Sequence, residues 1–178
     1  MPDTSSPMRR KQAGVAAGMA LGLGITVLAL AWPYPPAAPG DLATRLAVWA
    51  ACDLLAGVWL VIAVSRLARH RFFAPDDIDA ALAPGSAGAR VLQSLIQNTL
   101  EQLVLAVIAY GAWLLIPRPT LPAAAVWAAA GCFSLGRVLF FAGYGRGAAF
   151  RALGFALTLY PTVGLMAVRA WLLVSTAS

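Results

Sequence analysis

Charged residues are scarce in this chain of 178 residues. Only 11% are Asp, Glu, Lys or Arg, whereas 61% are apolar and the mean hydropathy is +0.77. Because soluble domains carry about 25% charged residues, the composition excludes an ordinary soluble domain and indicates a membrane protein. The net charge of +6 comes from Lys and Arg at the ends of apolar runs. This is the arrangement of membrane topology rather than of nucleic-acid binding, so no nucleic-acid partner is expected.

Metal-ligating and nucleophilic residue types are also few. His70 is the only histidine, and the two cysteines, Cys52 and Cys132, stand alone inside apolar runs. A structural or catalytic zinc site needs three or four such ligands, so no metal site is predicted, and the cysteines are interpreted as packing residues. His70 falls in a predicted basic loop, where a solvated role in topology is expected rather than catalysis. Nucleotide fingerprints and nucleophile elbows are missing as well.

No alternation typical of strands is visible, and long apolar runs dominate instead. Segments of about 18 or more apolar residues cross a bilayer as helices, since lipid requires backbone groups to be satisfied internally. The sequence contains five such segments: Ala13 to Trp32, Leu46 to Ser65, Val91 to Ile116, Ala123 to Tyr144, and Ala152 to Val174. The predicted fold class is therefore all-α integral membrane, with residues 1–178 as a single membrane domain.

Positive charges in short connections predict the orientation. One side of the bundle collects Arg9, Arg10, Lys11, Arg66, Arg69, Arg71, Arg90, Arg146 and Arg151, and the other only Arg45, Arg118 and Arg169. The N-terminus is therefore predicted to be cytoplasmic and the C-terminus outside. The first segment has two interpretations, a retained helix or a signal peptide ending at "ALA" (residues 29–31). Gly14, Gly18 and Gly22, spaced by four, would suit a close helix contact.

The third segment, "LQSLIQNTLEQLVLAVIAYGAWLLI", carries polar residues that a membrane helix does not need. A carboxylate in lipid costs several kcal/mol unless it is paired or hydrated, so Glu101 requires a partner. Helical spacing places Ser94, Gln97, Asn98 and Glu101 on one stripe, with Gln102 at its edge. At 1.5 Å per residue, Arg137 of the fourth segment lies at a depth similar to that of Glu101. An ion pair between Glu101 and Arg137 is predicted. Asp53 is a second carboxylate in an apolar segment, with Arg45 or Arg169 as possible partners.

The polar residues allow two interpretations. In the first, the ion pair and the amides hold helices together. In the second, Asn98, Glu101, Tyr144 and Arg151 line a cytoplasm-facing pocket for a small zwitterionic or anionic ligand. Spacing alone leaves both open. In "GRVLFFAGYGRGAAFR", Arg137, Tyr144 and Arg151 recur at steps of seven and share nearly the same face if the helix continues.

The motif "IQNTLEQ" resembles the N-x-x-E helix of the MAPEG proteins, the membrane-associated proteins in eicosanoid and glutathione metabolism. The motif "GRVLFFAGYGRGAAFR" is similar to the R-x(6)-Y-x(6)-R helix end of the same family, and the whole looks like a bacterial member. The resemblance runs from Leu46 to the C-terminus. It implies a four-helix unit at about 44–174, with an additional helix at about 13–32, in the bacterial inner membrane. It also implies a homotrimer that binds glutathione at subunit boundaries, so a partner for Glu101 can come from a neighbouring chain.

The resemblance assigns roles residue by residue. It implies that Asn98 and Glu101 contact the backbone and amino end of glutathione and that Tyr144 lines the pocket. Arg137 matches a structural or ligand-facing arginine, and Arg151 matches an arginine that stabilises the thiolate. A guanidinium beside a thiol, whose ordinary pKa is about 8.5, favours the nucleophilic anion.

Four positions depart from the family pattern. Ser94 and Gln97 stand where arginines commonly grip glutathione, Gln102 stands where some members have a tyrosine, and Phe140 stands where a polar or tyrosyl side chain is frequent. Two functions follow as hypotheses. The first is a glutathione-dependent transferase or peroxidase acting on lipophilic electrophiles. The second is a non-catalytic lipid-binding or scaffold protein. A transporter is the weaker third, because no inverted repeat is visible.

Overall fold

The structure, a computed structural model, describes residues 5–34, 40–78, 85–116 and 121–175. Within these ranges the chain is helical and contains no strand. The five long helices are α1 (Ser5–Leu30), α2 (Leu42–Phe73), α3 (Ala87–Leu115), α4 (Ala124–Gly143) and α5 (Ala148–Val174), and two short 3₁₀ turns are η1 (Pro75–Asp77) and η2 (Tyr144–Arg146). All five long helices are long and apolar enough to cross a membrane, which confirms the all-α membrane fold.

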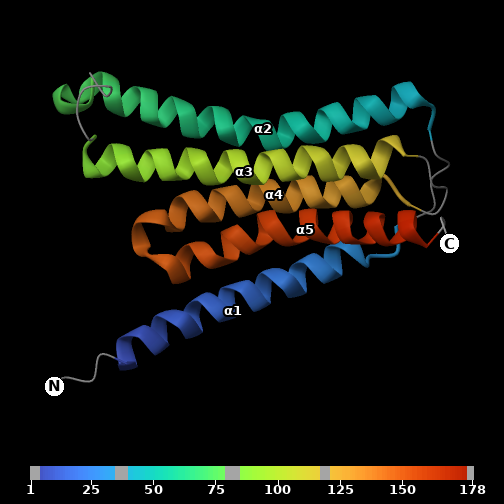
Figure 1. The fold of residues 1–178 in the computed structure, drawn as a ribbon, viewed down its shortest axis with the longest axis horizontal. Coiled ribbons are helices and arrows are strands. Elements are labelled where there is room, and N and C mark those ends of the chain that lie inside the picture. The colour runs from blue at the N-terminus through green and yellow to red at the C-terminus, as the bar shows by residue number, and fades with distance from the viewer. Residues whose placement is uncertain (1–4, 35–39, 79–84, 117–120, 176–178) are drawn as a thin grey trace.

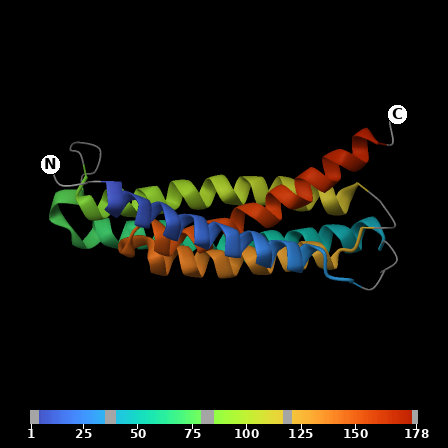
Figure 2. The same ribbon diagram turned by 90° about the horizontal axis from the view of Figure 1, so that it is seen from below.

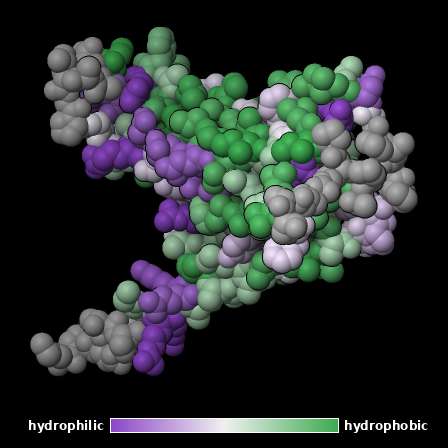
Figure 3. All heavy atoms as spheres, turned by 45° about the vertical axis from the view of Figure 1, so that its right-hand side comes forward, coloured by the Kyte–Doolittle hydropathy of each residue, from purple (hydrophilic) through white to green (hydrophobic). Residues whose placement is uncertain are grey.

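The helices run up and down in one bundle (Figure 1). The start of α1, the end of α2, the start of α3 and the α4–α5 turn lie at the same end of the bundle, here called the N-terminal end, and the end of α5 lies at the other. Helix α2 packs on α3, α4 packs on α5, and α1 packs on α5 at the edge of the bundle. Hydrophobic side chains cover most of the surface in Figure 3, while hydrophilic side chains gather toward the N-terminal end around a hollow.

The helices extend beyond the apolar segments at the N-terminal end. Helix α1 begins at Ser5 rather than Ala13, and α2 ends at Phe73 rather than Ser65. Long basic side chains carry their charge to the water interface, so a helix can continue past its apolar stretch. The predicted basic loop is therefore wrong for His70, which lies in the last turn of α2. Arg118 lies outside the described residues.

A polar tie joins α2 to α3. The Asp77 carboxylate accepts hydrogen bonds from the backbone N–H of Ser86 (2.7 Å) and from its hydroxyl (2.6 Å), and His70 Nε2 lies 2.9 Å from the same carboxylate. Ser86 also caps α3, because its Oγ accepts from the N–H of Ala89. The same ring nitrogen of His70 approaches both the serine and the aspartate, so the imidazole does not bridge them as it does in a catalytic triad. His70 thus takes part in the contact between the end of α2 and the start of α3.

Small side chains bring α2, α3 and α4 together in the core. Ala56, Ala106 and Ala130 are fully buried, and they leave room for the rings of Tyr110 and Phe133. Cys52 is fully buried in this core and Cys132 is half-buried, and both are free thiols. The prediction that Cys52 is a packing residue is confirmed.

Glycines fix α1 against α5. A Cβ added at Gly14 would lie 2.9 Å from Ala149 Cβ, and one at Gly18 would lie 3.1 Å from Ala152 Cβ. A Cβ at Gly22 would collide with Ala156 Cβ. The four-residue spacing in α1 thus marks a real helix contact of the small-residue type, in which backbones approach closely.

The α4–α5 hairpin depends on glycine in two ways. A Cβ at Gly143 would lie 2.6 Å from the carbonyl oxygen of Phe150, so the helices meet backbone to backbone near the turn. Gly147 has φ +102°, a conformation that residues with a Cβ rarely adopt, and it reverses the chain just before α5. Pro161 lies inside α5 further on, and the C-terminal half of that helix leaves the common direction of the bundle (Figure 2).

Candidate functional site

Arg137 is completely buried between α3, α4 and α5. Its Nη1 donates to Asn98 Oδ1 (3.0 Å) and Thr99 Oγ1 (3.4 Å), and its Nη2 donates to Thr158 Oγ1 (2.6 Å). The guanidinium also lies 4.7 Å from the ring centre of Phe140. A guanidinium stays charged in proteins, and it is held here by neutral oxygens and an aromatic face rather than by an acid.

The predicted ion pair between Glu101 and Arg137 is wrong. Glu101 is exposed on α3 and accepts a hydrogen bond from Gln97 (2.8 Å), one turn earlier on the same helix. The depth was predicted correctly, since Arg137 bonds to Asn98 and Thr99, within one turn of Glu101. The direction in which Glu101 points was predicted wrongly. Glu101 follows Asn98 by three positions, which turns its side chain by about 60° about the helix axis, away from Asn98.

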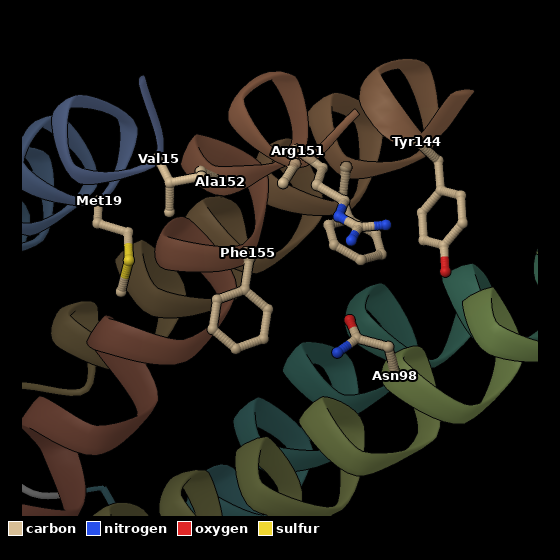
Figure 4. A pocket seen from close by; sticks show the side chains of 9 residues that line it. Val15, Met19, Asn98, Tyr144, Arg151, Ala152 and Phe155 are labelled. Atoms are coloured by element: carbon tan, nitrogen blue, oxygen red, sulfur yellow. The ribbon is translucent and has the colours of Figure 1, made fainter. Parts of the chain in front are cut away.

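A pocket of about 350 Å³ opens at the N-terminal end between α1, α3, α4 and α5. Three of the predicted site residues line it from different elements: Asn98 on α3, Tyr144 in η2 and Arg151 on α5 (Figure 4). The remaining lining residues are apolar: Val15, Met19, Phe140, Ala148, Ala152 and Phe155. Arg137 lies behind Asn98 and Phe140 rather than in the wall, and Glu101 is not part of the wall.

The bond to Arg137 fixes which way the Asn98 amide points. A guanidinium can only donate, so the amide atom that faces it must be the oxygen. The Asn98 nitrogen is then left as a donor, and it makes no hydrogen bond with any residue in the described part of the chain. Asn98 therefore offers its N–H₂ group to the pocket as a donor. The carbonyl of the same amide is polarised by the buried cation Arg137.

Arg151 and Tyr144 meet across the α4–α5 turn. The guanidinium of Arg151 lies 4.9 Å from the centre of the Tyr144 ring, and this ring packs edge-on against Phe140 at 5.4 Å between centres. The prediction of one continuous helical face is wrong, because α4 ends at Gly143. The 3₁₀ turn and the reversal at Gly147 bring the two side chains together instead. Stacking on the ring leaves the donors of Arg151 in the plane of the guanidinium available for a ligand.

The sequence agrees with the family indicated by these motifs. The sequence model of the MAPEG family matches residues 46–171, which is more than half of the chain. The chain belongs to the MAPEG family. Comparisons with curated proteins and with solved structures gave no match.

Family membership connects this MAPEG protein to membrane-associated glutathione and eicosanoid metabolism. The matched region covers α2 to α5 and leaves out α1 (Ser5–Leu30). The pocket nevertheless includes Val15 and Met19 of α1. The pocket wall thus combines residues from the matched region with residues of α1, which lies outside it.

Sequence reasoning missed several residues at this site. Phe155 follows Arg151 by four positions and shares its helix face, a spacing from which it could have been predicted. Thr158 had no such signal, because a threonine in a membrane helix usually bonds to its own backbone. Here its hydroxyl does so, through Phe155 O (2.8 Å), and also accepts from Arg137.

The expected partners of Asp53 are engaged elsewhere. Arg169 donates to the carbonyl of Ile116 (2.6 Å) and Arg45 to that of Leu115 (3.5 Å), both at the C-terminal end of α3. Within the described residues, Asp53 forms an ion pair with neither, and its Oδ1 is buried without a hydrogen bond. The carboxylate lies on α2, away from the pocket of Asn98 and Arg151.

Proposed function

We propose that this protein is a membrane-embedded, glutathione-dependent transferase or peroxidase that acts on lipophilic electrophiles. The observation that carries the proposal is the pocket in which the Asn98 amide, Tyr144 and Arg151 converge. These three residues come from α3, η2 and α5, and they are three of the five residues that the family motifs single out.

The electrostatics of the pocket favour an anion. Arg151 lines it, Arg137 lies directly behind Asn98, and none of the described lining residues is acidic. The apolar walls keep the local dielectric constant low, so the attraction between these cations and a negative group is stronger than in water. The negative groups of glutathione are its two carboxylates and, once ionised, its thiolate, and these groups suit this environment.

Glutathione would supply the sulfur nucleophile. Arg151 would stabilise the thiolate and so lower the pKa of the thiol from its ordinary value of about 8.5. Asn98 would donate its N–H₂ to a carbonyl or carboxylate of the tripeptide, and Tyr144 would confine the ligand at the turn. Catalysis would then come from thiolate activation combined with proximity of the two reactants.

A second copy of the chain would complete the site. The pocket offers no acid for the amino group of glutathione, and Glu101 faces outward from α3. Glu101 lies midway along α3, about 21 Å from either end. A carboxylate exposed to lipid at that depth is costly, so another subunit is expected to cover it. The family's homotrimer, with glutathione at subunit boundaries, meets both needs.

The pocket and the orientation fit a supply of thiol from the cytoplasm. Arg151 and Tyr144 lie at the N-terminal end, the end at which most of the Arg and Lys residues gather. If this end faces the cytoplasm of a bacterial inner membrane, glutathione enters from water while the acceptor arrives through the bilayer. The Asn98–Arg151 pocket is the place where the two would meet.

Calorimetry with glutathione on the purified protein tests the proposal. We expect the unmodified protein to bind at millimolar affinity or better and Arg151→Ala to weaken binding at least tenfold. The matched control is Arg146→Ala, which removes an exposed arginine of the same turn that does not line the pocket. An absence of binding by the unmodified protein, together with no glutathione-dependent turnover of several electrophiles, would reject the proposal.

A second candidate is a non-catalytic lipid-binding protein. The observation in its favour is that six of the nine lining residues are apolar. In that case Arg137 and its oxygen ligands only hold helices together. Arg151→Ala would then leave the cellular function intact, whereas bulky substitutions in the apolar wall would abolish it. The opposite result favours the enzyme.

A further inference from the structure

The pocket is divided into a polar and an apolar end. In Figure 4, Arg151, Tyr144 and Asn98 lie on one side, while Val15, Met19, Ala152 and Phe155 lie on the other. The polar end accounts for an anionic, thiol-bearing ligand. The apolar end, built by α1 and α5, has no role in the function proposed so far.

The position of the α1 wall is fixed. Gly18 lies on α1 between Val15 and Met19, and a Cβ at this position would lie 3.1 Å from Ala152 Cβ, itself a pocket residue. Adjacent contacts at Gly14 and Gly22 extend this seam along α5. The close contact between α1 and α5 therefore fixes the positions of Val15 and Met19 relative to Phe155.

We propose that α1 selects the acceptor: the apolar group of the electrophile binds inside a single chain, between Val15 and Met19 of α1 and Phe155 of α5. This inference rests on the proposed function. It adds that substrate choice depends on a helix outside the matched family region 46–171. The apolar group lies beside the sulfur held at Arg151, rather than only in a crevice between subunits.

The lining chemistry defines the substrate class. Met19 is flexible and polarisable and adapts to aromatic or aliphatic groups, while Phe155 adds a flat aromatic face. The whole pocket holds about 350 Å³, which it must share with the thiol end. It suits a compact aromatic or short aliphatic electrophile. With an aryl chloride, for example, the sulfur–carbon bond forms as the carbon–chlorine bond breaks and chloride leaves.

Comparing glutathione with S-hexylglutathione by calorimetry isolates the apolar end without any turnover. Each methylene buried adds severalfold to affinity, so the hexyl derivative is expected to bind at least tenfold more tightly than glutathione to the unmodified protein. Met19→Trp fills the apolar end and should remove most of this gain, so that the two ligands bind this variant with similar affinity. Leu21→Trp is the matched control, since Leu21 is exposed on the opposite side of α1, and it should keep the gain.

Met19→Ala provides a second variant in case tryptophan prevents folding. It removes the wall rather than filling it and should reduce the hexyl gain severalfold. If both Met19 variants keep the full gain, the inference is overturned while the proposed function stands. If the unmodified protein binds neither ligand, the proposed function itself is overturned, and the inference with it.

Discussion

Arg137 shows how a membrane protein can bury a cation without an acid beside it. Transferring an unpaired charge into a low-dielectric interior costs many kcal/mol, so its polar contacts must be well satisfied. Three side-chain oxygens from two helices accept from Nη1 and Nη2, and the face of Phe140 covers the guanidinium, while Nε is buried without a hydrogen bond to any described residue. One consequence concerns function: because no carboxylate neutralises Arg137 among the described residues, its field reaches Asn98 and the pocket beyond it.

Thr158→Val tests the contribution of one of these oxygens. The substitution keeps the shape of the side chain but leaves Arg137 Nη2 without its shortest hydrogen bond. An unsatisfied buried donor costs about 1–3 kcal/mol, and more when it belongs to a charged group, so the free energy of unfolding in mixed detergent micelles should fall by at least about 1–3 kcal/mol.

Thr162→Val is the control for this prediction. Thr162 is also buried on α5, one turn further on, and its hydroxyl only donates to the backbone carbonyl of Thr158. Hydrogen bonds between membrane helices average only about 0.6 kcal/mol, and this variant removes a local bond that satisfies no charged group, so it should lose less than Thr158→Val. Equal losses would show that Arg137 does not depend on Thr158.

The polar stripe of α3 shows what helix geometry predicts and what it does not. Spacing placed Ser94, Gln97, Asn98 and Glu101 on one face, and their angles about the axis do fall within about 100° of one another. Within this arc, Asn98 marks the boundary between exposed and buried side chains, because the neighbouring helices cover only one side of it. Ser94, Gln97 and Glu101 are exposed, and Gln102 and Thr99, beyond the other edge, are buried.

The sequence alone could give the number of helices, their approximate bounds, the depth of Arg137 and three of the pocket residues. Each of these depends on apolar length or on a motif within one helix. It could not give the partners of Arg137 or the wall at Val15 and Met19, because both depend on how α1, α3 and α5 are rotated against one another. Rotation is set by packing, such as the close approach at Gly22, which a spacing pattern suggests but does not orient.

Asp77 gives a pH-dependent prediction for the α2–α3 connection. The hydroxyl of Ser86 lowers the pKa of Asp77 most, followed by the backbone N–H of Ser86 and by His70. Because the folded pKa lies below the unfolded value of about 3.9, ionised Asp77 stabilises the fold above that pH. This stabilisation is lost as the pH falls through the folded pKa.

The measurement compares the thermal midpoint of the unmodified protein with that of Asp77→Asn, which mimics the protonated acid. The unmodified protein should be more stable at pH 7, and the difference should shrink as the pH falls below about 4. Asp76→Asn, at the exposed neighbouring position, should show no such convergence. A difference that is constant with pH would exclude Asp77 as the titrating group.

At the scale of the whole molecule, one face of the bundle is unsuited to lipid. Ser94, Gln97 and Glu101 are exposed on the half of α3 nearer the N-terminal end, whereas exposed residues of α1 such as Leu21 and Leu28 are apolar. A lipid-facing carboxylate bonded only to a glutamine retains most of its desolvation cost. A second copy of the chain placed on this α3 face would relieve it, whereas α1 needs no further cover.

Ser94→Trp is expected to disrupt this assembly. The indole would add bulk where α3 is proposed to meet another subunit, and overpacking typically costs about 1–3 kcal/mol at each contact. Native mass spectrometry from detergent should show a trimer for the unmodified protein and a shift to smaller species for Ser94→Trp. Leu28→Trp, on the exposed apolar face of α1, should remain trimeric. A monomeric unmodified protein, or a Ser94→Trp trimer as stable as the control, would mean that the α3 face is not the contact. Glu101 would then need water, rather than a subunit, at its depth in the membrane.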